Sequence, residues 1–264
     1  MEVDNENQAL WEQFYMYSNT LNETLRQRTP PTSLQCNIGF NYIYHPFEYA
    51  GEIYGNFLKK YLDGPKKILF VGMNPSRFGS LQTGIPFGDI ATVRDRMKLQ
   101  GAIRNAPNLH SNITIKGLQS WAEEEPSSQR FWDLIKTIFN DEEDFLDRFF
   151  ENCFVHNFCP LVFIDNNGYN VSFADVAERV PDMEKACLDI LQQQVELLQP
   201  KIIVPIGWYV FETLLELDYY KQGKCVVERI RHPSPNCYAQ ENDWIDESRR
   251  KLLNNRTFSY YVYS

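Results

Sequence analysis

Three polar side chains in this sequence stand at or near the ends of apolar runs, and their chemistry suits a flat ring with polar edges. Asn74 and His232 each follow an apolar run, and Asn157 lies inside a third. Side-chain amides both donate and accept hydrogen bonds, and an imidazole can polarise a bound group near neutral pH. No serine, cysteine or carboxylate nucleophile with a base partner accompanies them, which disfavours a covalent hydrolase. The set suits binding a heterocycle, polarising it with the histidine and placing a water with an amide.

Each of these residues also has an ordinary structural explanation. Asn157 fits a buried amide that is satisfied by neighbouring backbone, and His232 fits a turn histidine before proline. Asn74 precedes Pro75, and Asn-Pro is common in turns where the asparagine caps the backbone. Their joint occurrence at the ends of three separate runs favours the functional interpretation.

Residues 68–88 form the stretch with the strongest functional character. They begin as a continuous apolar run, typical of a strand buried on both faces, and then break into a loop rich in glycine and proline. The carboxyl end of such a strand is the usual place for a site in an open α/β sheet. Asn74 and Gln82 are spare polar side chains in this loop, free to contact a ligand. Phe78 and Phe87 are suited to stacking on a planar ligand. The sequence lacks Gly-x-x-x-x-Gly-Lys-Ser/Thr and Gly-x-Gly-x-x-Gly, so a phosphate-binding loop is not indicated.

Apolar runs alternate with helical patterns, which predicts an α/β fold with a mainly parallel sheet and helices on both faces. The strands are expected at 68–71, 153–161, 201–206 and 225–230, and helices at 48–62, 92–99, 127–139, 142–150, 181–198, 208–217 and 242–252. The tail 258–263 is expected to dock as an edge strand or plug. Because the carboxyl ends of parallel strands share one edge, Asn74, Asn157 and His232 are expected to converge there. The third strand ends in Gly207, which offers only its backbone.

The composition bounds the class of protein. The chain has 264 residues, 43% of them hydrophobic, and a net charge of −9. It is large enough for a sizeable core, and it has neither a membrane-spanning apolar run nor a signal-peptide pattern. The negative charge argues against broad nucleic-acid binding, which normally shows a basic footprint. A local positive face is nevertheless predicted from the basic residues that follow the central loop, which are Arg77, Arg94, Arg96, Lys98 and Arg104.

The six cysteines form no Cys-x-x-Cys pair, so reduced thiols in an intracellular compartment are expected. Cys153, His156 and Cys159 lie close in sequence, but in a strand the cysteines and the histidine point to opposite faces. No metal site is therefore expected.

The first 36 residues are expected to form an arm that is partly helical or disordered. Leu10, Phe14, Tyr17 and Leu21 recur at helical spacing, which predicts an amphipathic helix packed against the body, with partner binding as the alternative. Residues 37–264 are expected to form a single domain.

Four motifs, in order and with matching flanks, resemble the single-strand-selective monofunctional uracil-DNA glycosylases, a branch of the uracil-DNA glycosylase superfamily. The motifs are Gly72-Met73-Asn74-Pro75, residues 82–88, residues 155–161 and His232-Pro233-Ser234-Pro235, and the similarity covers roughly residues 40–250. The resemblance implies that the domain 37–264 is catalytic. It also implies a three-layer α/β/α sandwich with a central four-stranded parallel sheet.

The resemblance further implies hydrolysis of the N-glycosidic bond of uracil in DNA, without metal or cofactor, to leave an abasic site. In this interpretation Phe87 stacks on the flipped base, Asn157 reads its edge, and backbone groups near Met73 complete the pocket. His232 stabilises the departing uracil anion, and Asn74 positions the attacking water. The implied substrate is uracil in single- or double-stranded DNA, acted on by a monomer in the nucleus and away from membranes.

The sequence departs from the family pattern at two places. In the segment 233–244, which corresponds to the family's DNA wedge, Asn236 stands where the family often carries arginine, and Tyr238 is the candidate to fill the gap by stacking. The predicted DNA contacts are Pro233, Ser234, Pro235, Asn236 and Tyr238. Ser76 replaces a common glycine in the substrate pocket, which bears on tolerance of 5-hydroxymethyluracil and related oxidised pyrimidines.

Three other functions remain alternatives at this point. A damaged-DNA binding protein with little or no catalysis would keep the pocket, but the presence of Asn74 and His232 disfavours it. A superfamily glycosylase for deaminated purines is disfavoured by the Asn157 edge contact, which suits a pyrimidine. A hydrolase of free nucleosides would need no wedge.

Overall fold

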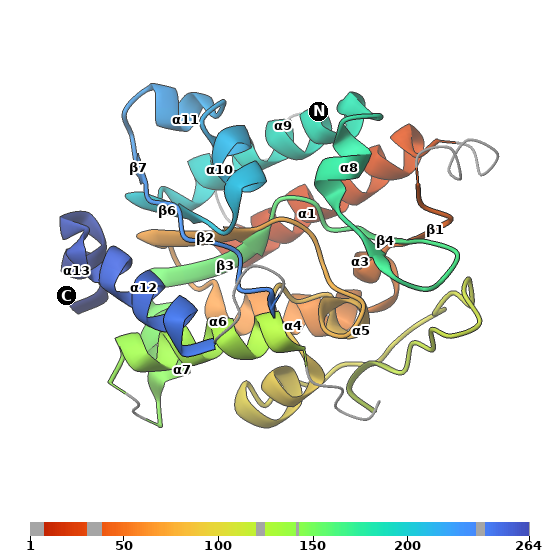
Figure 1. Ribbon diagram of the computed structural model, residues 1–264, viewed down its shortest axis with the longest axis horizontal. Coiled ribbons are helices and arrows are strands. Elements are labelled where there is room, and N and C mark those ends of the chain that lie inside the picture. Colours follow the sequence, from red (N-terminus) through yellow and green to blue (C-terminus); the bar gives the residue numbers. More distant parts are fainter. Residues whose placement is uncertain (1–7, 31–38, 120–124, 141–142, 236–240, 264) are drawn as a thin grey trace.

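A four-stranded parallel sheet organises the computed structural model, which describes residues 8–30, 39–119, 125–140, 143–235 and 241–263. Its strand order is β3 (Cys153–Asn157), β2 (Ile68–Gly72), β6 (Ile202–Pro205) and β7 (Val226–Val227), as Figure 1 shows. All three pairings are parallel, so the four carboxyl ends share one edge. The predicted four-stranded parallel sheet is confirmed, because the runs are apolar on both faces as a covered sheet requires.

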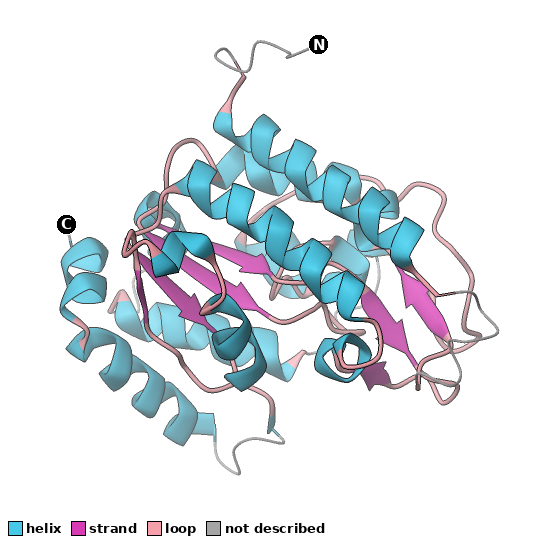
Figure 2. Ribbon diagram, turned by 90° about the horizontal axis from the view of Figure 1, so that it is seen from above, coloured by secondary structure: helices cyan, strands magenta, loops and turns pink. Residues whose placement is uncertain are grey.

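Helices cover both faces of this sheet, which gives the expected three layers (Figure 2). On one face, the ring of Phe70 in β2 meets aromatic rings from α6 (Pro126–Ile138), α7 (Phe145–Asn152) and α13 (Arg256–Tyr263). On the other face, Phe154 in β3 meets Phe14 of α1 (Leu10–Arg28) and Phe57 of α4 (Gly51–Tyr61). Successive strand residues point to opposite faces, so neighbouring positions of β3 serve different layers.

The remaining elements complete the layers around the sheet. They are α3 (Pro46–Tyr49), α5 (Ser80–Thr83), the π-type helix Thr92–Arg96, the 3-10 turn Gly117–Gln119, α8 (Phe173–Ala177), α9 (Pro181–Leu198), α10 (Trp208–Leu214), α11 (Asp218–Lys221) and α12 (Glu241–Asn254). A second, antiparallel sheet of β1 (Tyr42–Tyr44), β4 (Val162–Ile164) and β5 (Asn170–Val171) was not expected from the sequence. Its strands are too short to give a clear alternating pattern. No helix in the described ranges is long and apolar enough to cross a bilayer.

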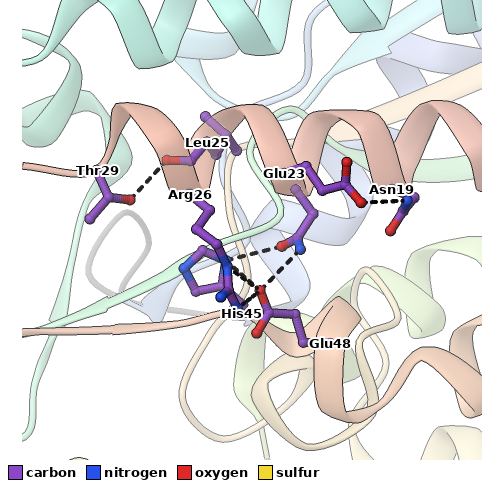
Figure 3. A network of polar contacts seen from close by, with 8 residues as sticks. Asn19, Glu23, Leu25, Arg26, Thr29, His45 and Glu48 are labelled. Atoms are coloured by element: carbon purple, nitrogen blue, oxygen red, sulfur yellow. Dashed lines mark hydrogen bonds and ion pairs between the residues drawn. The ribbon is translucent and has the colours of Figure 1, made fainter.

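The helix α1 packs along α9, and its apolar stripe enters the main core. Phe14 is completely buried, and its ring meets the His156 ring edge-on at 5.1 Å. A polar network seen in Figure 3 joins the exposed side of α1 to α3, because Arg26 Nε donates to Glu48 Oε1 at 3.1 Å. Asn22 links His45 and Glu48 in the same network. The expectation that an amphipathic helix would pack against the body is therefore confirmed, whereas the boundary at residue 36 lies outside the described residues.

The tail 258–263 was expected to dock as an edge strand or plug; it docks on the core, but the strand was wrong, because these residues belong to the helix α13. Asn255 Oδ1 accepts hydrogen bonds from the backbone N–H groups of Thr257 and Phe258, which starts the helix. Phe258 and Val262 are both buried, one helical turn apart. The aromatic content suggested a strand, but helix packing against Phe70 overrode that propensity.

Two expected helix boundaries also changed. The helix expected at 127–139 begins at Pro126, and its N-cap is Glu125, whose carboxylate accepts from Ser127 N and Ser128 N. The helix expected at 48–62 is divided into α3 and α4 at Ala50.

We expect Phe14→Ala to lower the free energy of unfolding by ~3–5 kcal/mol, because it empties a fully buried ring site between α1 and β3. Equilibrium urea unfolding measures this change. Met16→Ala in the same helix is the matched control, since Met16 is 47% exposed and should lose less than about 0.5 kcal/mol. Equal midpoints for wild type and Phe14→Ala would contradict the docking of α1.

Candidate active site

A pocket of about 450 Å³ opens at the shared carboxyl edge of the parallel sheet. The predicted residues that line it are Met73, Asn74, Ser76, Phe87, Asn157, His232 and Ser234. Further lining comes from Ser80, Glu125, Ser127, Asn170, Val171 and Ser172. Pro233 and Pro235 lie in the same loop as His232 without lining the pocket, and Asn236 and Tyr238 fall outside the described residues. The expected convergence of the two asparagines and the histidine is confirmed.

Asn157 is placed by the parallel register of β2 and β3, in which it lies directly opposite Gly72. A side-chain carbon added at Gly72 would lie 2.5 Å from Asn157 Oδ1 and 3.0 Å from the Phe87 ring, so only glycine leaves room for both. Asn157 is 7% exposed, and within the described residues no protein group bonds to its amide. A nearly buried amide without a protein partner is suited to a ligand.

Phe87 is held by α6 so that one ring face is backed and the other faces the pocket. Its ring stacks on Phe131 with centroids 4.5 Å apart. Its backbone has φ of 51°, which is unusual for a bulky residue. The carbonyl oxygen accepts from Trp132 Nε1 at 2.8 Å and from the Ser128 hydroxyl, and these bonds hold the strained backbone in place.

Three hydrogen bonds fix His232 and its loop, two of them from side chains on α6 and α12. Its Nδ1 accepts from Ser234 N at 3.1 Å, so the remaining proton of the neutral ring is on Nε2. Trp244 Nε1 donates to the Arg231 carbonyl, and the buried Arg130 donates from Nη1 to the Pro233 carbonyl, each at 3.0 Å. Burial lowers the pKa of His232 to about 4, so the ring is neutral at pH 7 and can donate from Nε2.

Asn74 lies in the loop that follows β2, and its amide is oriented from the opposite wall. Its Oδ1 accepts from Phe173 N at 3.2 Å, at the start of α8. A carboxamide oxygen has a second lone pair, so it can still accept a hydrogen bond from a water. The Met73 carbonyl accepts from Cys159 N at 2.9 Å, which ties the same loop to the extension of β3.

The site contains residues that the sequence argument did not identify. Ser128, Arg130, Phe131 and Trp132 on α6 support both Phe87 and the His232 loop, although only their helical pattern was visible in the sequence. Gln82 was expected as a spare polar group, and this was wrong. Its Nε2 donates to the Thr114 carbonyl and its Oε1 accepts from Lys116 N and Gly117 N, so it anchors the segment 113–119.

Comparison with known proteins agrees with this arrangement. The family model of the uracil DNA glycosylase superfamily matches residues 59–254. The chain belongs to the uracil-DNA glycosylase superfamily. A single-strand selective monofunctional uracil-DNA glycosylase from Rattus norvegicus is 34% identical over 233 residues, covering 88% of this chain and 82% of the relative. The Bos taurus protein of the same name is 32% identical over 253 residues, which cover 96% of this chain and 89% of the Bos taurus protein.

A solved structure supports the fold of this superfamily member independently. The wild-type Pedobacter heparinus SMUG2 superposes with a TM-score of 0.60 at 22% identity, covering 90% of this chain and 98% of its own. At that identity the likeness establishes the three-layer fold and leaves the site to be argued from its geometry.

We expect the free energy of unfolding to fall as the pH is lowered from about 6.5 toward about 4. Burial lowers the pKa of both His232 and His156 to about 4, whereas an unfolded histidine has a pKa near 6.5. The unfolded chain therefore binds more protons in this window. The stability contributed by each histidine is complete above the unfolded pKa and is lost toward the folded one, by ~1–2 kcal/mol per histidine at about pH 5.

Urea unfolding at about pH 7 and about pH 5 checks this expectation. His232→Gln removes one titrating ring, so this variant should lose less stability than wild type between the two conditions. An identical loss in both proteins would show that His232 is not shifted.

Proposed function

We propose that this chain excises uracil from DNA by hydrolysing the N-glycosidic bond, as a monofunctional base-excision repair glycosylase that leaves an abasic site. The observation that carries the proposal is the convergence of Asn74, Asn157 and His232 around the free face of Phe87 in one pocket. The relatives named above are monofunctional uracil-DNA glycosylases, which supports the same reaction.

The pocket reads the base after it has left the helix. A base inside a duplex is out of reach, so the nucleotide is flipped at a cost of a few kcal/mol. Uracil then stacks on Phe87, whose other face is backed by Phe131. The Asn157 amide donates to O4 and accepts from N3–H, whereas cytosine presents the opposite pattern and would leave buried groups unpaired.

Bond breaking is driven by stabilising charge on both fragments. Negative charge develops on the departing uracil, and His232 donates from Nε2–H to O2. A neutral donor suffices because the ring is fixed in place before the reaction begins. Asn74 holds the attacking water, and its contribution is orientation because an amide does not take up the proton. The DNA phosphates help to stabilise the cation that forms on the sugar.

The proposal extends to the strand preference, the setting of the reaction and the substituted bases that the pocket accepts. We propose a preference for unpaired strands with additional action on duplexes, by a monomer that works in the nucleus without metal or cofactor. Ser76 adds a hydroxyl to the pocket wall where the family often has glycine. We propose that this hydroxyl alters the acceptance of uracil that carries a 5-hydroxymethyl group. Pro233, Ser234 and Pro235 follow His232 directly and are the proposed start of the DNA-contacting segment.

Excision from a labelled oligonucleotide with a single uracil tests the reaction, with a magnesium chelator present and alkali used to cleave abasic sites. We expect cleavage that depends on uracil and is absent with thymine or cytosine. Asn74→Ala should lower the single-turnover rate by ~10²-fold, because the water loses its orientation. Asn19→Ala is the matched control, since this asparagine pairs with Glu23 on the exposed side of α1.

The outcomes of this assay separate the alternatives. A folded wild type that binds uracil-containing strands without cleaving them would favour a damage sensor and overturn the proposal. Release of hypoxanthine or xanthine in preference to uracil would contradict recognition of the pyrimidine edge by the Asn157 amide. Equal activity on free deoxyuridine would contradict DNA as the substrate.

Gly72→Ala should lower uracil excision by ~10²-fold while the protein stays folded. The added carbon would displace the Asn157 amide and the Phe87 ring edge, and misplacement of about 1 Å costs ~10²-fold in rate. The matched control is Gly64→Ala, because a carbon added at Gly64 meets no atom within 4 Å. Single-turnover excision and circular dichroism are measured on both variants. Wild-type excision by Gly72→Ala would contradict the proposed role of Asn157.

A further inference from the structure

An exposed tryptophan lies beside the active-site pocket with an arginine stacked on it. Trp208, the first residue of α10, is 57% exposed. The Arg229 guanidinium lies 4.8 Å from the centre of the Trp208 ring and 5.8 Å from that of Phe211. Within the described part of the chain Arg229 makes no ion pair, so its charge is available to an anion.

This pair adjoins the His232 side of the pocket. Trp208 follows Gly207, and a side-chain carbon added at Gly207 would lie 3.7 Å from His232 Cβ. Arg229 precedes His232 by three positions, and the bridge between Ile206 and Ile230 holds the two segments together. The Trp208–Arg229 pair is therefore fixed to the backbone that places the histidine.

A second pair of the same kind adjoins the other side of the pocket. Phe78 is 42% exposed, and the Arg77 guanidinium lies 4.8 Å from its ring centre. Arg77 N donates to Asn170 Oδ1 at 3.0 Å, and Asn170 lines the pocket. Arg77 also makes no ion pair with a described carboxylate. Some other arginines are paired with carboxylates, among them Arg26 with Glu48, Arg94 with Asp95 and Arg104 with Glu52.

We propose that the Trp208–Arg229 and Arg77–Phe78 pairs form a binding surface for the unpaired DNA strand on the two sides of the flipped nucleotide. Exposed rings stack on flanking bases, and the guanidinium groups, which have no described carboxylate partner, contact flanking phosphates. Arg77 Nη1 donates to the Gly168 carbonyl, which leaves its other N–H groups for a phosphate. The inference rests on the proposed function for the position of the strand. It gives a chain of net charge −9 a local means of holding a polyanion, because Arg77 and Arg229 lack ion pairs with described carboxylates and adjoin residues of the pocket.

A single strand fits this surface better than an intact duplex. Trp208 and Phe78 offer π-faces, which bind bases only when those bases are unstacked from their neighbours. In a paired duplex the bases flanking the lesion remain stacked inside the helix, so only the two arginines would contribute.

The first test measures the affinity of Trp208→Ala for an undamaged single-stranded oligonucleotide of about 15 nucleotides. We expect ~5- to 100-fold weaker binding by fluorescence anisotropy. Arg229→Gln should reduce the slope of log affinity against log salt by about 0.7, the value for one lost phosphate contact on a single strand. Because this test needs no catalysis, its result stands even if the protein excises no uracil.

Two matched controls lie away from the pocket. Tyr260→Ala removes an exposed ring, 67% exposed, from α13. Lys224→Gln removes a cation that lies 5.4 Å from the Tyr219 ring centre, before the amino end of β7. Both controls should bind the strand as wild type does.

The second test uses excision and separates binding from catalysis. For Trp208→Ala, KM for a long uracil-containing single strand should rise with kcat unchanged, whereas the same strand with abasic residues in place of the bases on both sides of the uracil should show no effect of the substitution. Unchanged affinity in Trp208→Ala and Phe78→Ala would overturn the proposal. An equal loss on a fully paired duplex, or on the strand with abasic flanking residues, would contradict stacking with flanking bases.

Discussion

The site depends on the close approach of β2 and β3 at their carboxyl ends. Gly72 and Asn157 face each other in the parallel register, and the space that a side chain on Gly72 would occupy is taken by the Asn157 amide and the Phe87 ring. The register also separates neighbouring residues of β3 by function. Asn157 points toward Phe87 and the pocket, whereas His156 points to the opposite face and is buried against Phe14 of α1.

A single helix then couples the two walls of the pocket. From α6, Phe131 backs the stacking ring, Trp132 and Ser128 hold its carbonyl, and Arg130 holds the loop of His232. Because these groups lie within two turns of one helix, the distance between the stacking ring and the histidine is set by a rigid element. In the proposed reaction, a preorganised neutral His232 needs no rearrangement when charge develops on the leaving group.

An acidic protein that acts on DNA must keep its cations where the polyanion binds. Several arginines are paired with carboxylates, whereas Arg77 and Arg229 are stacked on the exposed rings of Phe78 and Trp208. Of the basic residues from which the sequence predicted a positive face, Arg94 and Arg104 are paired with Asp95 and Glu52, and Arg77 bonds to the pocket residue Asn170. Charge distribution, which the sum of charges conceals, decides where a strand can lie.

The sequence by itself determined the parallel sheet and the residues at its edge. Runs that are apolar on both faces have few alternatives to buried parallel strands, and the carboxyl ends of such strands meet. The positions of Asn74, Asn157 and His232 in or directly after these runs therefore predicted their convergence. Only the tertiary structure decided the supports, such as Arg130 on the Pro233 carbonyl, the helical tail on Phe70, and Arg229 on Trp208. These contacts join segments far apart in the chain, and local periodicity shows which face of an element is buried but not which partner meets it.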